Sequence, residues 1–160
     1  MQDKNESYEE EAKRLISDNK YMVVATSDKD GNSWAATVFY VYDKKYNFYF
    51  LSAVDSRHCE FINKNPKVAF VIFDANQPIG HSEGIQALGR ASFVKDRELE
   101  EVIKLYSNRL FPKSTIPPGT RYPKENYGEA SEFRFYKIEV SNLYVTGTID
   151  RRTEVDRTSL

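Results

Sequence analysis

The chain lacks the residue patterns on which several kinds of functional site depend. Its 160 residues include a single cysteine, Cys59, which excludes an intramolecular disulfide and fits a reducing compartment. The two histidines, His58 and His81, and the scattered carboxylates have no spacing typical of a metal site. No catalytic triad and no glycine-rich nucleotide loop is present. Any functional site in this chain must therefore be built from residues outside these patterns.

Charge and hydrophobic length give no support for nucleic-acid or membrane binding. The 23 basic and 24 acidic residues nearly cancel, and the basic residues do not cluster as they do in nucleic-acid-binding proteins. The N-terminus is acidic and polar, without the apolar core of a signal peptide. No run approaches the roughly 20 apolar residues that a membrane span needs. We therefore expect a cytoplasmic protein with no nucleic-acid or membrane partner.

Hydrophobic periodicity predicts a mainly β fold with a few helices. Ser7 and Glu10 form a capping box before an amphipathic helix that should end near Asn19. A second long helix should begin at Asp96 as N-cap. Strands are expected over 21–27, 33–42, 48–53, 67–74 and 84–94, and a closing hairpin over 133–140 and 143–148. The first three strands should form an antiparallel meander, and the whole a six- to seven-stranded antiparallel barrel.

Length and composition also predict the domain organisation. Residues 1–149 should form one domain, and the charged residues 150–160 a tail that frays. Residues 111–130 contain four prolines and form a predicted loop of a length that is often functional or mobile.

Residues 48–74 are the most informative segment, because they read as strand, short loop, short helix and strand. Ser56, Arg57 and His58 stand at the start of the helix. A helix N-terminus offers unpaired N–H groups and the positive end of a dipole. A hydroxyl, a guanidinium and an imidazole added there favour phosphate binding. The alternative is a capped helix with a surface arginine. For Cys59 we expect packing on the inner helix face rather than nucleophilic chemistry.

Three sequence features resemble the flavin-binding split-barrel family that includes pyridoxamine 5′-phosphate oxidase. They are SWAATVFYVYD followed by FYFLSAVDSRH, the helix closed by NKNPKVAFVIF, and GIQALGRASFV, which is similar to the family's GxA strand. Together they cover about residues 22–94. The ending LYSNRLFP is similar to an uncharacterised bacterial branch of the family.

The resemblance implies a homodimeric split barrel with flavin mononucleotide (FMN) at the subunit interface and an oxidoreductase of unknown substrate. It implies cofactor contacts from Ala35, Thr37, Val38, Leu51, Ser52, Ser56, Arg57, His58 and Gln86. Gln86 matches the family only by its strand face. Two alternatives stay open: a non-enzymatic protein that stores, carries or senses flavin or haem, and a dimeric scaffold with a vestigial phosphate site.

The chain departs from the oxidase pattern in three places. Arg57-His58 stands where the oxidase often has Arg-Lys, and residues 35–40, AATVFY, contain no cation. The last strands, FRFYKIEVSNLYV, lack the tryptophan of the oxidase. These departures predict either weak flavin binding or a preference for another ligand. We also expect no useful oxidation of pyridoxamine 5′-phosphate.

Overall fold

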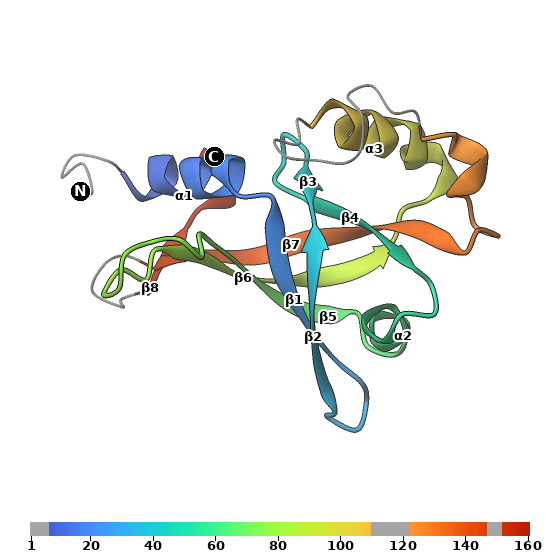
Figure 1. The fold of residues 1–160 in the computed structure, drawn as a ribbon, viewed down its shortest axis with the longest axis horizontal. Coiled ribbons are helices and arrows are strands. Elements are labelled where there is room, and N and C mark those ends of the chain that lie inside the picture. The colour runs from blue at the N-terminus through green and yellow to red at the C-terminus, as the bar shows by residue number, and fades with distance from the viewer. Residues whose placement is uncertain (1–6, 110–121, 147–151) are drawn as a thin grey trace.

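The computed structural model describes residues 7–109, 122–146 and 152–160, in which a curled β-sheet carries helices along its edges (Figure 1). The elements are α1 (Tyr8–Asp18), β1 (Tyr21–Ser27), β2 (Ser33–Phe39), β3 (Val41–Tyr42), β4 (Phe48–Ala53), α2 (Arg57–Lys64), β5 (Lys67–Phe73), β6 (Gly84–Phe93), α3 (Asp96–Asn108), β7 (Phe133–Thr146) and β8 (Arg152–Val155). Short 3₁₀ turns span Lys124–Asn126 and Arg157–Ser159. No helix in the described ranges is long and apolar enough to cross a membrane.

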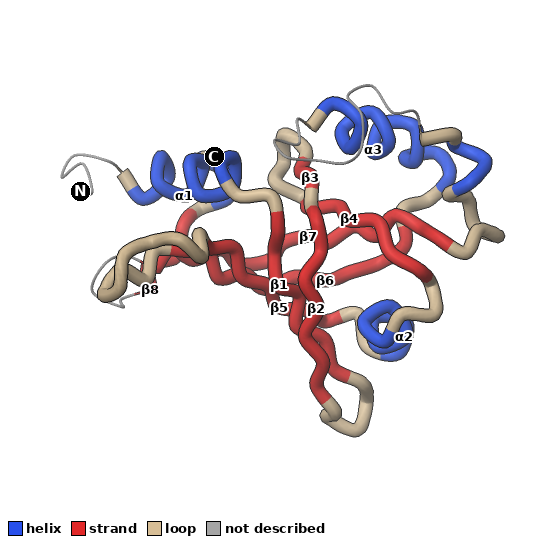
Figure 2. The backbone as a smooth tube through the Cα atoms, in the orientation of Figure 1, coloured by secondary structure: helices blue, strands red, loops and turns tan. Residues whose placement is uncertain are grey.

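The strands form one antiparallel sheet in the order β2-β1-β5-β6-β7-β4-β3, with β8 beside β7 off that path. β2 and β3 follow each other in the chain but lie at the two ends of this order. Only Tyr40 separates them, so the chain passes from one edge of the curled sheet directly to the other (Figure 2). This arrangement confirms the predicted mainly β, antiparallel split barrel.

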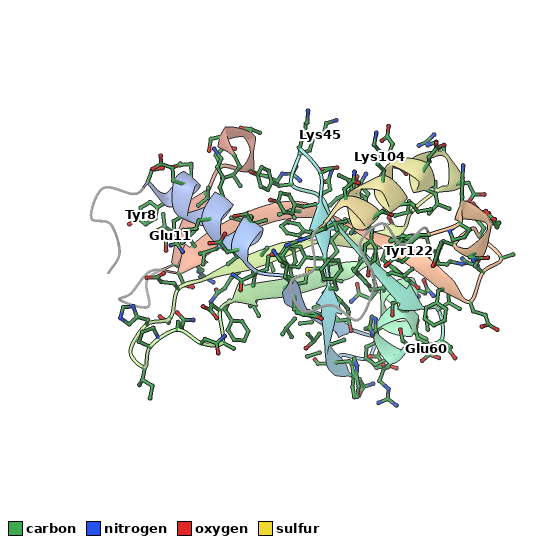
Figure 3. The ribbon with its side chains drawn as sticks, turned by 45° about the horizontal axis from the view of Figure 1, so that its top comes forward. Tyr8, Glu11, Lys45, Glu60, Lys104 and Tyr122 are labelled. Carbon is green, nitrogen blue, oxygen red and sulfur yellow. The ribbon has the colours of Figure 1, made fainter. Side chains whose placement is uncertain are left out.

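Alternation along the strands divides the apolar residues between two cores. Phe48, Phe50 and Tyr136 point into the main core, whereas their strand neighbours Tyr49 and Phe135 belong to a second cluster. That second cluster is closed by Leu99, Val102 and Tyr106 of α3, with Tyr122 and Tyr127 packed against it (Figure 3). The sheet between Phe48 and Ala53 is therefore covered on both faces.

Two of the predicted strand boundaries are wrong, for reasons of pairing. The single strand expected over 33–42 divides at Tyr40, because β2 pairs with β1 whereas β3 pairs with β4. The closing hairpin around Ser141 and Asn142 does not form. Instead β7 continues through both residues, and Ser141 is the extra residue of a bulge opposite Leu88 and Gly89. Ser and Asn favour turns, but continuous pairing along β6 prevails here.

Gly89 lies at this irregularity and shows why that strand needs a glycine. A Cβ at this position would lie 2.6 Å from the Glu139 carbonyl oxygen and 2.8 Å from Ile138 Cγ2. No side chain fits at such separations, so the close approach of β6 and β7 depends on this residue.

The chain ends differ from expectation at one end only. The capping box at Ser7 and Glu10 is present, and α1 ends before Asn19 as predicted. The predicted frayed tail is wrong for its described part, because Arg152–Val155 forms β8 and pairs with β7.

α3 begins one residue earlier than predicted, with Lys95 rather than Asp96 as N-cap. Residues 111–121 of the predicted proline-rich loop lie outside the described residues.

Candidate functional site

Four polar side chains gather where β4 leads into α2: Ser52, Ser56, Arg57 and His58, which we call the α2-start cluster. Ser52 Oγ lies 2.8 Å from His58 Nε2 and 3.2 Å from Ser56 Oγ. Ser56 is the N-cap residue of α2, as the sequence predicts, but its hydroxyl donates to the Ala53 carbonyl oxygen at 2.8 Å. No side chain in the described ranges therefore caps the first N–H groups of α2.

His58 is half-buried within this cluster, and its charge state follows from that position. Burial lowers the pKa of the imidazole below its usual value, and no carboxylate contributes to the shift. The neutral form is therefore favoured at pH 7. His58 acts in the cluster as a hydrogen-bonding group towards the two serine hydroxyls rather than as a cation.

Arg57 provides the cation that His58 does not. Its side chain is exposed, and the guanidinium carbon lies 4.9 Å from the centre of the Trp34 ring. Trp34 itself is 42% exposed near the start of β2. In the described part of the chain, Arg57 makes no ion pair. Its N–H donors are accordingly available to an anion from solvent.

The outer face of β2 carries two of the predicted contact residues. Ala35 and Thr37 are exposed, whereas Val38 points the other way into the main core and is only 7% exposed. Thr37 lines a cavity of about 620 Å³ together with Tyr21, Val23 and Phe73, among others. About 10 Å of strand separates Trp34 from Thr37, at the usual rise per residue.

The remaining predicted residues do not join the cluster by their side chains. Leu51 packs against the second core, on the opposite face of β4 from Ser52. Gln86 is exposed on β6, where it pairs in register with Val71 and Tyr144. Cys59 is fully buried in the main core, as the sequence analysis expected. The structure thus joins Ser52, Ser56 and His58 by their side chains, places the Arg57 guanidinium on the Trp34 ring, and puts Ala35 and Thr37 on the other face of β2 from Trp34.

Two residues near the cluster were missed by the sequence analysis. Arg134 is the register partner of Ser52 across β4 and β7, and its guanidinium carbon lies 4.7 Å from the centre of the Phe93 ring. Tyr136 is fully buried, and its hydroxyl has no hydrogen-bond partner among the described residues. Burial and the neighbouring Cys59 thiol raise the pKa of Tyr136. Neither position carried a signal in sequence, because both depend on the pairing of β4 with β7.

A family model described as pyridoxamine 5′-phosphate oxidase matches residues 8–146 of this chain. Among curated proteins, UPF0306 protein PM1958 of Pasteurella multocida (strain Pm70) is 25% identical over 102 residues. That match covers 61% of this chain and 68% of the relative. The match to the family model therefore extends over strands β1 to β7 and includes the α2-start cluster.

Solved structures with the same fold include two proteins that are named for haem. A haem-binding protein from Mycobacterium smegmatis superposes with a TM-score of 0.74 at 16% identity, covering 97% of this chain and 60% of that one. The haem storage protein HutZ from Vibrio cholerae superposes with a TM-score of 0.70 at 18% identity, covering 91% of this chain and 100% of that one. At these identities the likeness establishes a shared fold.

Proposed function

Because this chain belongs to the pyridoxamine 5′-phosphate oxidase family, we propose that it binds FMN, with the phosphate at the α2-start cluster. The flavin ring would lie against the outer face of β2, beside Ala35 and Thr37. FMN bound there would supply two-electron redox chemistry, for which the protein provides position and electrostatic environment. The substrate class is an oxidisable or reducible small molecule.

The single observation that carries this proposal is the uncapped start of α2 beside an exposed arginine. The Ser56 hydroxyl donates to the Ala53 carbonyl oxygen and makes no cap hydrogen bond, so the first N–H groups at the positive end of the helix dipole have no side-chain acceptor from the N-cap residue. Arg57 adds the formal charge, and Ser52 adds a hydroxyl. These groups fit a phosphate, which takes both N–H donors and a guanidinium fork.

The ring position rests on size and shape. Ala35 and Thr37 are small and exposed, so a planar ring can approach the strand closely. The cavity of about 620 Å³ that includes Thr37 lies within the range of cofactor sites. Trp34 shares the inner face of β2 with Val38, so FMN would have to pass around this edge strand to place its phosphate near Arg57 and its ring beside Thr37.

We further propose that the protein is a homodimer, paired through the outer face of the sheet. Small or apolar side chains lie on that face, with Phe73 and Leu88 each 47% exposed. Exposed apolar area of this kind commonly marks an interface. A second copy would also complete the cavity around Thr37. Light scattering at micromolar concentration should give twice the 18.6 kDa of the monomer, and a monomer would contradict the interfacial site.

The test of the proposed function is a comparison of FMN with riboflavin, which lacks the phosphate. Flavin and Trp34 fluorescence should show tighter binding of FMN. Arg57→Ala should weaken FMN binding roughly tenfold to more than a hundredfold, because a charge-assisted contact contributes about 1.5–3 kcal/mol. The matched control is Lys64→Ala, which removes an exposed cation from the other end of α2. Equal affinity for the two flavins would remove the phosphate site.

Haem is the second candidate ligand, because two structures with this fold are named for haem. The half-buried, neutral His58 is the residue in this chain that fits an iron ligand. Absorption spectra after adding haem or FMN to the apo protein separate the two hypotheses. A Soret band that His58→Ala abolishes would favour haem.

Sustained aldehyde formation from pyridoxamine 5′-phosphate by the FMN-loaded protein would contradict the prediction that this oxidation does not occur.

A further inference from the structure

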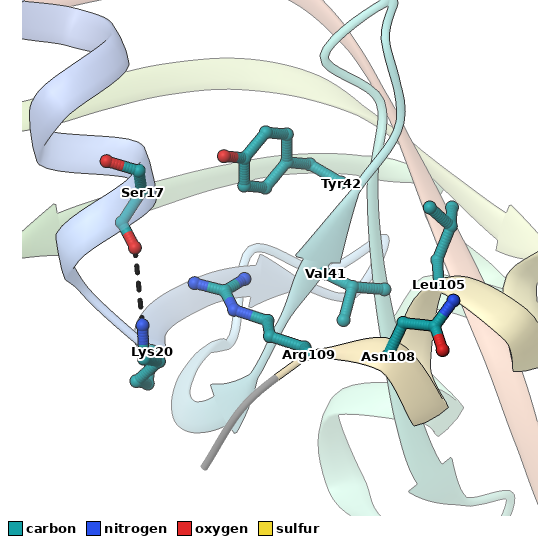
Figure 4. A pocket seen from close by; sticks show the side chains of 7 residues that line it. All are labelled: Ser17, Lys20, Val41, Tyr42, Leu105, Asn108 and Arg109. Carbon is teal, nitrogen blue, oxygen red and sulfur yellow. Dashed lines mark hydrogen bonds between the residues drawn. The ribbon is translucent and has the colours of Figure 1, made fainter. Parts of the chain in front are cut away.

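A second recess lies where the end of α1, strand β3 and the end of α3 meet (Figure 4). It has a volume of about 380 Å³, which is the size of a pocket for a small organic molecule. The side chains that line it include Lys20, Val41, Tyr42, Leu105, Asn108 and Arg109. Lys20 also lines the cavity around Thr37, so the two recesses adjoin at this residue, whereas Val41, Tyr42 and Arg109 line this recess and not the cavity around Thr37.

The charge of this recess is positive. Lys20 and Arg109 both line it, and no acidic residue does so in the described part of the chain. Neither cation makes an ion pair among the described residues. Burial and then the charge of Arg109 lower the pKa of Lys20, and the nearby Asp18 opposes that effect less strongly. Burial and the Arg109 charge therefore both disfavour the charged form of the Lys20 ammonium group.

The partial negative charge at the C-terminal end of α1 offsets part of the positive charge of Lys20 and Arg109, but not all of it. Lys20 Nζ donates to the Ser17 carbonyl oxygen at 3.3 Å, and Arg109 donates to the carbonyl oxygens of Asn19 and Tyr40. The C-terminal end of a helix carries only about half a negative charge. Two full positive charges exceed it. Arg109 uses two of its five N–H groups in these bonds, and Lys20 uses one of three, so donors remain for a ligand.

The rest of the recess has the character of a site for the body of a ligand. Val41 and Leu105 supply apolar surface, and the ring of Tyr42 lies on the side opposite Lys20 (Figure 4). The Asn108 carboxamide adds a polar group from the end of α3. An anionic head near Lys20 and Arg109 would leave an aromatic or aliphatic body against these surfaces.

We propose that this Lys20–Arg109 pocket binds a small organic oxyanion, a phosphate monoester or carboxylate joined to an aromatic or aliphatic body. The head group would pair with both cations and the body would lie against Val41, Tyr42 and Leu105. Such a ligand would join the ends of α1 and α3 to β3, and would therefore stabilise the junction that it occupies.

Phenyl phosphate and benzoate are suitable probes, and inorganic phosphate serves as the head group alone. Titration of the full chain, followed by amide chemical shifts, should move the signals of Val41, Tyr42 and Asn108. Lys20→Met should weaken binding of the preferred probe by about tenfold or more, as expected for loss of a charge-assisted contact. The matched control is Lys45→Met at the exposed tip of the β3–β4 turn, which should leave affinity unchanged (Figure 3).

A charge-reversal variant separates loss of binding from loss of folding. Lys20→Glu should place a carboxylate beside the Arg109 guanidinium, so its melting temperature should equal or exceed that of the wild type, while probe binding disappears. Three results would overturn the proposal: unchanged affinity in Lys20→Met, equal loss in Lys45→Met, or no shift of these amides at 10 mM of any probe. Preference for phenyl phosphate or for benzoate identifies the head group. Titration of phenyl phosphate into Arg57→Ala should match the wild type, because Arg57 does not line this recess, and that result separates this proposal from the proposed flavin site.

Discussion

Arg57 at the start of α2 and Arg109 at the end of α3 both contact aromatic rings, yet they differ in how many of their N–H donors are already used. Arg57 is exposed and stacks on one ring, that of Trp34. Arg109 donates to two backbone carbonyl oxygens and lies 4.4 Å from the centre of the Tyr40 ring. The first arginine faces solvent with most of its hydrogen bonds unmade, and the second joins segments of the fold.

The groups that an arginine already contacts in the folded chain, rather than its presence in the sequence, indicate its role. The contacts of Arg109 lie at the end of α1 and at the bend between β2 and β3, where the barrel passes from one edge to the other. Removing it would take one donor from the Tyr40 carbonyl oxygen and one of two donors from the Asn19 carbonyl oxygen, both of them partly buried. Removing Arg57 would uncover one face of the Trp34 ring, which is already partly exposed. Stability should therefore depend far more on Arg109 than on Arg57.

The largest expected effect tests this difference directly. Arg109→Ala should lower the free energy of unfolding by about 2–4 kcal/mol, because two charge-assisted hydrogen bonds and several ring contacts are lost. Arg57→Ala should change it by no more than about 0.5 kcal/mol, as for an ordinary surface substitution. Urea denaturation followed by circular dichroism measures both. Equal losses in the two variants would show that the comparison is wrong.

A smaller effect is expected at Tyr40, which joins the same segments as Arg109. Its hydroxyl donates to the Ile16 carbonyl oxygen at 2.7 Å, and burial raises the pKa of Tyr40 to about 12. Tyr40→Phe leaves that carbonyl group unpaired and should cost about 1–2 kcal/mol of unfolding free energy. Tyr42→Phe is the matched control, because its ring stacks on Tyr46 and its hydroxyl has no hydrogen bond to a described residue. A Tyr42→Phe loss as large as that of Tyr40→Phe would contradict the assignment.

The smallest expected effect concerns pH and His58 in the α2-start cluster. Burial lowers the pKa of His58 in the folded protein, so below about pH 6.5 the unfolded chain binds more protons. Stability should therefore fall as the pH decreases from 7 through the folded pKa, and rise again on return. His58→Asn should flatten this part of the pH dependence of unfolding free energy, whereas His81→Asn should retain it. An unchanged slope in His58→Asn would mean that another group is responsible.

Local patterns predicted most of the secondary structure correctly. The capping box at Ser7 and Glu10, the strand periods and the proline after Asn65 act within a few residues, and the elements they predict are present. The errors lie where distant partners override local preference. Ser141 and Asn142 favour a turn, but ten residues of β6 pair along β7 and hold them in the strand. The tail at Arg152–Val155 is ordered by the same strand.

At the candidate site, the helix start and its residue types follow from the chain alone, because Ser56, Arg57 and His58 are consecutive residues. The other features depend on how the chain folds. Register between β4 and β7 placed Arg134 opposite Ser52, and burial made His58 neutral. The chain also folds Lys20 and Arg109, 89 positions apart, into one recess. Pairing and desolvation depend on contacts between distant segments, and no local pattern encodes them.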